Sequence, residues 1–188
     1  MIHAPKTLVI IGSVRAMRIG HRIAEWVAEV GRETATGVVE VVDLKDWPLP
    51  MDAEPSVPAM DDYRFEPVRA WSAKVSEGDA VVFVTPQYNW GYPAALKNAL
   101  DHLYKEWAGK PAIIVTYGSQ GGGKCAAQLR QVLEGLHMKT AATMPGLKLG
   151  RARVEANAGE IDPVAAFADH LGELRQAFTE LAAASASA

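Results

Sequence analysis

Short apolar runs that alternate with helical patterns limit the fold of this chain more than any other feature. Residues 7–11, 80–85 and 112–117 are almost wholly apolar, which is typical of strands buried on both faces of a parallel sheet. Apolar residues at helical spacing follow such runs, as between Ile19 and Val30. Five repeats of strand and helix predict an α/β fold in which helices cover both faces of a parallel sheet.

Right-handed crossovers leave few topologies for such a chain. A flavodoxin-like three-layer sandwich, with a five-stranded parallel sheet of order 2-1-3-4-5, fits the 188 residues. The whole chain, residues 1–188, is expected to form one domain with a disordered tail at 183–188, and residues 47–67 are interpreted as a long binding loop. Strands are predicted at 7–11, 38–43, 80–85, 112–117 and 139–144, and helices at 19–33, 64–76, 93–104, 126–136 and 162–181.

Charge and composition exclude several classes of protein. The net charge of −3 provides no basic excess for binding nucleic acid. The apolar runs are too short to cross a bilayer, and the N-terminus lacks a signal-peptide pattern, so a cytoplasmic protein without a membrane partner is expected. The single Cys125 excludes an internal disulfide, and no cluster of His and Cys has the spacing of a metal site.

The loop after the first predicted strand, residues 12–20, has the features of a phosphate site. It connects a strand to a helix, so its backbone amides and the helix dipole favour an anion. Ser13 provides a hydroxyl, and Arg15 and Arg18 provide guanidinium groups, with Ile19 and Gly20 completing the turn. Neither a Walker loop nor a dinucleotide glycine pattern is present, so a monophosphate is favoured. The alternative is a helix cap at Ser13 beside two solvated arginines.

The loop after the third predicted strand is rich in aromatic and amide groups. Pro86, Gln87, Tyr88, Asn89 and Trp90 follow one another there. Ligands of open α/β sheets lie outside the carboxyl ends of the strands, where these groups could hold the polar edge and the face of a flat heteroaromatic ring. The alternative is an aromatic loop that packs against a partner subunit. The two interpretations are compatible if the site lies at an interface.

A glycine-rich loop after the fourth predicted strand completes the candidate site. Glycines allow the backbone to approach a ligand closely, although a flexible turn before a helix would explain them equally well. Because the carboxyl ends of parallel strands meet at one edge, all three loops are expected to line one crevice. The candidate residues of this loop are Tyr117, Gly118, Ser119, Gln120, Gly121 and Gly122.

With these three loops, the chain resembles the NADPH-dependent FMN reductases, a flavodoxin-like family that includes quinone, chromate and azo reductases. The matching segments are 12–15, 85–89, 91–93, 96–98 and 117–122, within a similarity over residues 6–146. The resemblance implies bound FMN, with its phosphate on Ser13, Arg15 and the turn from Arg18 to Gly20. It places the isoalloxazine at residues 86–89 and 117–122. Many relatives carry Ser or Thr where Arg18 to Gly20 stand here, so the group that replaces this hydroxyl stays open.

The resemblance also implies the chemistry and the partners. NADPH or NADH would reduce the flavin, and a quinone, free flavin, azo dye or metal oxyanion would then oxidise it in a ping-pong cycle without a catalytic side chain. A homodimer or homotetramer is implied, to which exposed aromatics near Trp90 and Trp107 would contribute. His102, His137 and Cys125 are interpreted as packing or surface residues, and Lys97 with Asp101 as a helical ion pair.

Other interpretations remain open. The rivals are a flavodoxin-like electron carrier or flavin-based redox sensor that does not turn over NAD(P)H, and an enzyme that binds a nucleotide without flavin. Flavodoxins tend to be strongly acidic, so the net charge of −3 is mild evidence against a carrier. The arginines at 64, 69, 151 and 153 are candidates for contact with a 2′-phosphate, but their positions in space do not follow from the sequence.

Overall fold

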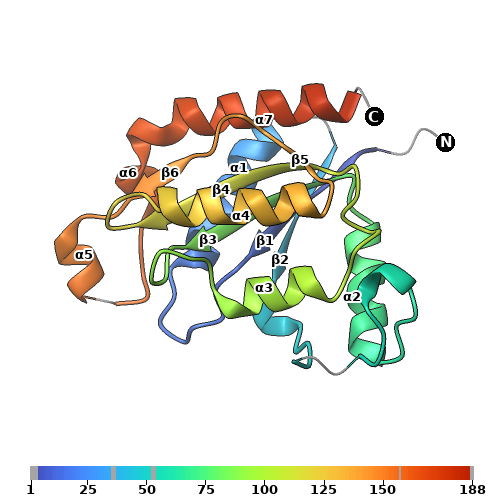
Figure 1. Cartoon of the computed structure of the whole chain (residues 1–188). Helices are drawn as coiled ribbons and strands as arrows, with labels where there is room; N and C mark the ends of the chain where they lie inside the picture. Colours follow the sequence, from blue (N-terminus) through green and yellow to red (C-terminus); the bar gives the residue numbers. More distant parts are fainter. Residues whose placement is uncertain (1–3, 35–36, 52–53, 157, 187–188) are drawn as a thin grey trace.

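A single parallel sheet forms the centre of the computed structural model, which describes residues 4–34, 37–51, 54–156 and 158–186 (Figure 1). Its strand order is β2-β1-β3-β4-β5, with β6 paired to β4 beyond this path, and the predicted flavodoxin-like order is confirmed. The strands are β1 (Lys6–Ile11), β2 (Val38–Asp43), β3 (Ala80–Pro86), β4 (Pro111–Gly118), β5 (Lys139–Thr140) and β6 (Gly146–Lys148).

Helices cover both faces of the sheet because its strands are apolar on both sides. Side chains alternate along β1, so Val9 and Ile11 pack into one core while Leu8 and Ile10 pack into the other. The first core includes α1 (Gly20–Thr34) and α7 (Leu171–Ala186), and the second includes α2 (Glu66–Ser76), α3 (Ala94–Asp101) and α4 (Gly123–Gly135). All seven residues of β3 are buried, which explains its continuous apolar run.

The strand register places three loops side by side. Ile11 at the end of β1 pairs with Val84 in β3, and Pro86 at the end of β3 pairs with Tyr117 in β4. The chain therefore leaves β1, β3 and β4 at the same edge of the sheet, as expected for parallel strands.

The C-terminal third departs from the predicted elements. The predicted fifth strand at 139–144 is wrong beyond Thr140, because Thr143 donates its backbone N–H (2.9 Å) and its hydroxyl (2.6 Å) to the carboxylate of Glu180 on α7 instead of joining the ladder. The sheet gains the short β6 instead, so it has six strands in the described residues. The predicted helix 93–104 ends earlier, at Asp101.

The predicted helix 162–181 is interrupted. Asp162 caps α6 (Pro163–Ala166), but Phe167 leaves the helical path and lies buried against Trp26, with ring centroids 5.9 Å apart. A 3-10 turn, η3 (Ala168–His170), then leads into α7.

Helix α7 extends to Ala186, into the segment 183–188 that the sequence predicted as a tail. Alanine has the highest helix propensity, and the Ser185 hydroxyl donates to the carbonyl of Leu181 at 2.9 Å. Residues 187–188 lie outside the described residues.

Two further short elements complete the chain between α1 and α2, η1 (Leu44–Asp46) and η2 (Pro58–Met60), and both lie at or near the predicted long loop. A short helix that was not predicted, α5 (Arg151–Ala156), projects from one side of the molecule (Figure 1). Over the described ranges, no helix combines the length and apolarity needed to cross a membrane.

Candidate active site

A cavity of about 690 Å³ lies at the carboxyl edge of the sheet, where the three loops were expected to meet. Its volume is within the usual range for small-molecule sites. The residues predicted from sequence that line it are Arg15, Arg18, Ile19, Pro86, Gln87, Tyr88, Tyr117, Gly118 and Ser119.

The loop after β1 presents Arg15 to the cavity and holds Arg18 in place. The Arg15 guanidinium lies 3.8 Å from the centroid of the Tyr88 ring, and Arg15 forms no ion pair within the part of the chain that the structure describes. Arg18 donates to the carbonyl of Ser13 at 3.1 Å and forms an ion pair with Asp43 at the end of β2. The free positive charge at this end of the cavity is therefore that of Arg15.

Ser13 lies beneath the cavity wall and does not line it. Its side chain is fully buried, and its hydroxyl oxygen lies 2.8 Å from that of Tyr88. Because α1 begins at Gly20, Ser13 does not cap this helix. Of the two arginines in the alternative interpretation, Arg15 is exposed and Arg18 is paired with Asp43. Ser13 joins the loop after β1 to the loop after β3.

Gly20 and Tyr117 are closely packed where α1 meets the sheet. A Cβ atom at residue 20 would lie 2.6 Å from the Tyr117 hydroxyl oxygen, so only glycine fits here without displacement. Burial, together with Tyr88 nearby, raises the pKa of Tyr117, so its hydroxyl stays protonated and can donate a hydrogen bond into the cavity.

The aromatic loop turns sharply after Tyr88. Backbone bonds between Tyr88 and Gly91 at 2.8 and 2.9 Å close the turn, and Asn89 and Trp90 have φ of 47° and 73°, a region that non-glycine residues rarely adopt. Asn89 and Trp90 do not line the cavity. Trp90 is 67% exposed, and Lys124 lies over its ring with Nζ 2.9 Å from the centroid.

Gln87 and Cys125 attach the aromatic loop to the start of α4. The Gln87 side-chain carbonyl accepts the N–H of Cys125 at 3.1 Å. Cys125 is fully buried, which confirms its interpretation as a packing residue, and this burial raises the pKa of its thiol to about 12.

Two glycines of the loop after β4 are required by close packing. A Cβ atom on Gly121 would lie 2.7 Å from the Gly146 carbonyl oxygen, and one on Gly122 would lie 2.7 Å from Cβ of Thr116. Both residues have positive φ, and neither lines the cavity, nor does Gln120. Gly118 does line it, and a Cβ there would approach nothing closer than 3.7 Å.

Other residues considered from the sequence lie away from the cavity. The Nε2 atom of His102 lies 2.6 Å from the Pro50 carbonyl oxygen, and Nε2 of His137 lies 3.1 Å from the Tyr104 hydroxyl. Trp107 is fully buried, so the expectation that it contributes exposed aromatic surface is wrong; its apolar neighbours enclose it. The Lys97–Asp101 ion pair is confirmed.

Sequence reasoning missed the contribution of Met17 in the loop after β1 and a wall from the C-terminal third of the chain. The residues of this wall are Leu149, Gly150, Ala152, Arg153, Val154, Ala156, Ala158, Gly159 and Glu160. Helix α5 buries none of its side chains, so its sequence has no apolar face from which a helix could be predicted. The glycines at 150 and 159 that bracket this wall were the available signal, and Gly159 has a positive φ of 72°. Among the arginines considered for a 2′-phosphate, Arg153 is the one that lines the cavity.

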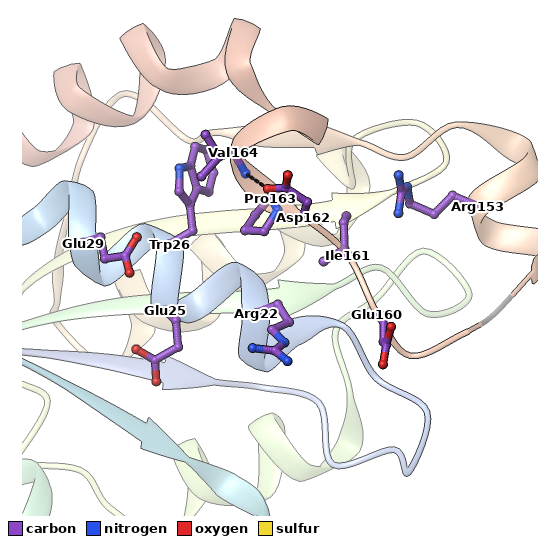
Figure 2. Close-up of a pocket in the computed structure, with 10 residues that line it drawn as sticks. All are labelled: Arg22, Glu25, Trp26, Glu29, Arg153, Glu160, Ile161, Asp162, Pro163 and Val164. Carbon is purple, nitrogen blue, oxygen red and sulfur yellow. Dashed lines mark hydrogen bonds between the residues drawn. The ribbon is translucent and has the colours of Figure 1, made fainter.

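A second groove, of about 620 Å³, lies between α1 and the segment that leads into α6 (Figure 2). It shares Arg153 and Glu160 with the first cavity. Figure 2 shows Asp162 bonded to the N–H of Val164, where it caps α6. The charged residues of the groove are Arg22, Arg153, Glu25, Glu29, Glu160 and Asp162. Carboxylates outnumber guanidinium groups there, so the groove suits a phosphate less well than the first cavity does.

The groups that line the first cavity are of the kinds that a flavin mononucleotide would need. Arg15 is suited to a phosphate, and Pro86, Tyr88 and Tyr117 are suited to the face and edge of a planar ring system. Fold and site together define a flavodoxin-like protein that binds a flavin nucleotide. No group of three or more potential metal ligands occurs among the described residues.

Comparison with known proteins identifies the family. The sequence model of the NADPH-dependent FMN reductases matches residues 5–146, and this chain belongs to that family. It is 53% identical to an NAD(P)H-dependent FMN reductase of Schizosaccharomyces pombe over 94% of this chain and 88% of that protein. It is 32% identical to a quinone reductase of Pseudomonas putida over 77% of both chains.

Solved structures agree on the fold. The flavoenzyme FerB of Paracoccus denitrificans, an NAD(P)H:acceptor oxidoreductase, matches with a TM-score of 0.71 and 22% identity. The match covers 95% of this chain and 97% of FerB, so the shared architecture extends beyond residue 146.

Proposed function

We propose that this protein transfers electrons from NAD(P)H to quinones and free flavin through one FMN-binding cavity, with azo dyes and metal oxyanions as further acceptors. The broader activity follows from the family: the chain is a flavin-dependent NAD(P)H oxidoreductase. The observation that carries the finer proposal is the meeting of the phosphate loop, the aromatic loop and the third loop around one cavity of suitable volume.

In this proposal the FMN phosphate lies on Arg15 and on the amides of the turn from Arg18 to Gly20. Ser13 supports this loop through its bond to Tyr88. The isoalloxazine lies between the two loops at the ends of β3 and β4, which the adjacent pairing of Pro86 and Tyr117 holds together. Asn89, Trp90 and residues 120–122 shape the loops from outside the cavity.

Bound FMN supplies the redox chemistry, since it can accept a hydride from a nicotinamide and pass two electrons to an acceptor. The protein positions the ring and surrounds it with fixed donors. Tyr117, Gly118 and Ser119 line the cavity, and in this proposal their hydroxyl and backbone amides are the donors that favour negative charge on the bound ring. In this proposal no side chain acts as a catalyst.

We further propose that the chain assembles as a homodimer or homotetramer. The exposed ring of Trp90 projects from a strained turn beside the cavity, and burial against a second copy would account for both its exposure and the aromatic content of this loop. Light scattering tests this directly: the proposal expects a multiple of the 20.2 kDa chain mass, and a monomer at micromolar concentration would contradict it.

Two-substrate kinetics test the catalytic proposal. NADPH or NADH is varied at several fixed concentrations of a benzoquinone, with FMN present. One cavity used alternately by donor and acceptor predicts parallel double-reciprocal lines. Intersecting lines would require both substrates to be bound at once and would refute a single shared cavity. Replacing the quinone in turn by free flavin, an azo dye and chromate ranks the acceptors.

A further inference from the structure

The cationic side chain of Arg18 closes the loop between β1 and α1. Between Ile11 and Gly20 this loop forms neither helix nor strand, apart from a turn at residues 16–17. One guanidinium nitrogen of Arg18 donates to the carbonyl of Ser13 at 3.1 Å, so the two ends of the loop are joined directly. Another nitrogen of the same group forms the ion pair with Asp43.

Asp43 is a rigid anchor for this contact. It is the last residue of β2, and its other carboxylate oxygen accepts the N–H of Lys45 at 3.0 Å, which caps η1. The side chains of Arg18 and Asp43 are 11% and 19% exposed, so the pair as a whole is less exposed than Lys74–Glu40, whose side chains are 19% and 34% exposed. A shielded pair between a strand end and a loop holds that loop more firmly than a surface pair does.

We infer that Arg18 and Asp43 form a clasp that positions the loop amides for the FMN phosphate, so that Arg18 acts as a positioning residue and Arg15 supplies the net charge. This inference rests on the proposed binding of FMN. Its electrostatic reason is that Asp43 already balances the charge of Arg18. The clasp also explains how the loop can lack a hydroxyl at residues 18–20, because the contacts of the Arg18 side chain hold the turn in place.

A change at Asp43 distinguishes the clasp from direct binding of the phosphate by Arg18. If Arg18 bound the phosphate directly, Asp43 would compete for the guanidinium, and removing its charge would leave FMN affinity unchanged or increase it. If the clasp positions the loop, removing the charge weakens FMN binding. Riboflavin has the same ring and no phosphate, so its affinity reports the ring site alone.

The experiment measures FMN and riboflavin dissociation constants of flavin-free protein by quenching of flavin fluorescence. Asp43→Asn keeps an acceptor for Lys45 but presents an amide to Arg18. We expect about tenfold weaker FMN binding, equivalent to about 1.4 kcal/mol, and unchanged riboflavin binding. Glu40→Gln is the matched control, since Glu40 lies on the same strand and pairs with Lys6 and Lys74; its FMN-to-riboflavin affinity ratio should equal that of the unaltered protein.

Arg18→Lys provides an independent test if Asp43→Asn folds poorly. An ammonium lacks the two-nitrogen fork with which the guanidinium reaches Ser13 and Asp43 together, so the clasp predicts a similar loss of FMN affinity in R18K and little further loss in the double variant R18K/D43N. If residue 18 bound the phosphate directly, D43N would instead restore affinity to R18K. Unchanged or tighter FMN binding in either variant, or an equal loss for both flavins, would overturn the clasp. Failure of the unaltered protein to bind either flavin would overturn the proposed function itself, and the clasp with it.

Discussion

Replacing Gly122 with alanine tests the structural role assigned to the third loop. Gly122 has a φ of 85°, and left-handed backbone costs a residue with a Cβ about 1–2 kcal/mol. The added Cβ would lie 2.7 Å from Cβ and 2.8 Å from Oγ1 of Thr116. Thr116 is fully buried and its hydroxyl donates to the Gly121 carbonyl, so it cannot move freely, and overpacking of this kind costs about 1–3 kcal/mol.

Together these effects predict that G122A lowers the free energy of unfolding by about 2–5 kcal/mol. In a chain of this length that corresponds to a fall in Tm of roughly 4–20 °C. The assay is thermal and urea unfolding of flavin-free protein, followed by circular dichroism, so that FMN binding does not contribute.

The adjacent glycine provides the control. Gly123 is the first residue of α4, and a Cβ there would meet nothing within 4 Å. G123A should therefore be neutral or stabilise by up to about 1 kcal/mol. Equal stabilities of G122A and G123A would refute the reasoning, because the two changes differ only in backbone conformation and in the nearby Thr116.

Three further predictions concern charge and reactivity. R15A should weaken FMN binding by about 1.5–3 kcal/mol, the range for a charged hydrogen bond, and leave riboflavin binding unchanged in fluorescence titrations; equal losses for both flavins would remove Arg15 from the phosphate site. Because burial raises the pKa of Cys125 to about 12, iodoacetamide at pH 8 should label the unfolded chain and spare the native one, as read by mass spectrometry. Hydrogen bonds from Lys74, and to a lesser extent from Lys6, lower the pKa of Glu77 to about 2 in the folded protein. Ionised Glu77 therefore stabilises the folded state above the unfolded pKa of about 4.3, and this stabilisation is lost as the pH falls towards 2. Acid unfolding of E77Q should lack this component, and identical pH profiles would contradict it.

The parts of the fold that were predictable depend on burial and on chain direction. Strands β1, β3 and β4 are mostly apolar because both faces of the sheet are covered, and parallel strands bring the loops that follow them to one edge. These two facts were sufficient to predict the sheet order and to bring together Arg15, Tyr88 and Tyr117 around one cavity.

The contacts that could not be predicted depend on partners distant in sequence. Thr143 ends a strand because Glu180 takes its N–H, and Arg18 leaves the solvent because Asp43 lies beside it. Neither pairing has a local signature. Trp90 points outward because the turn at Asn89 has positive φ, and asparagine merely permits that conformation.

The cavity wall around α5 was unpredictable for another reason. Its helix has no buried residue, so hydrophobic periodicity, the main signal for secondary structure, is absent there. No side chain of α5 is buried in the core, and Arg153 and Val154 line the cavity.

An anaerobic titration of the FMN-loaded protein with NADPH, and separately with NADH, tests the central claim most directly. The claim that one cavity binds FMN and admits a nicotinamide predicts rapid loss of the visible flavin band with one equivalent of at least one donor, and the faster donor identifies the preferred coenzyme. FMN that binds but keeps its visible band with both donors would contradict the claim and indicate an electron carrier or sensor.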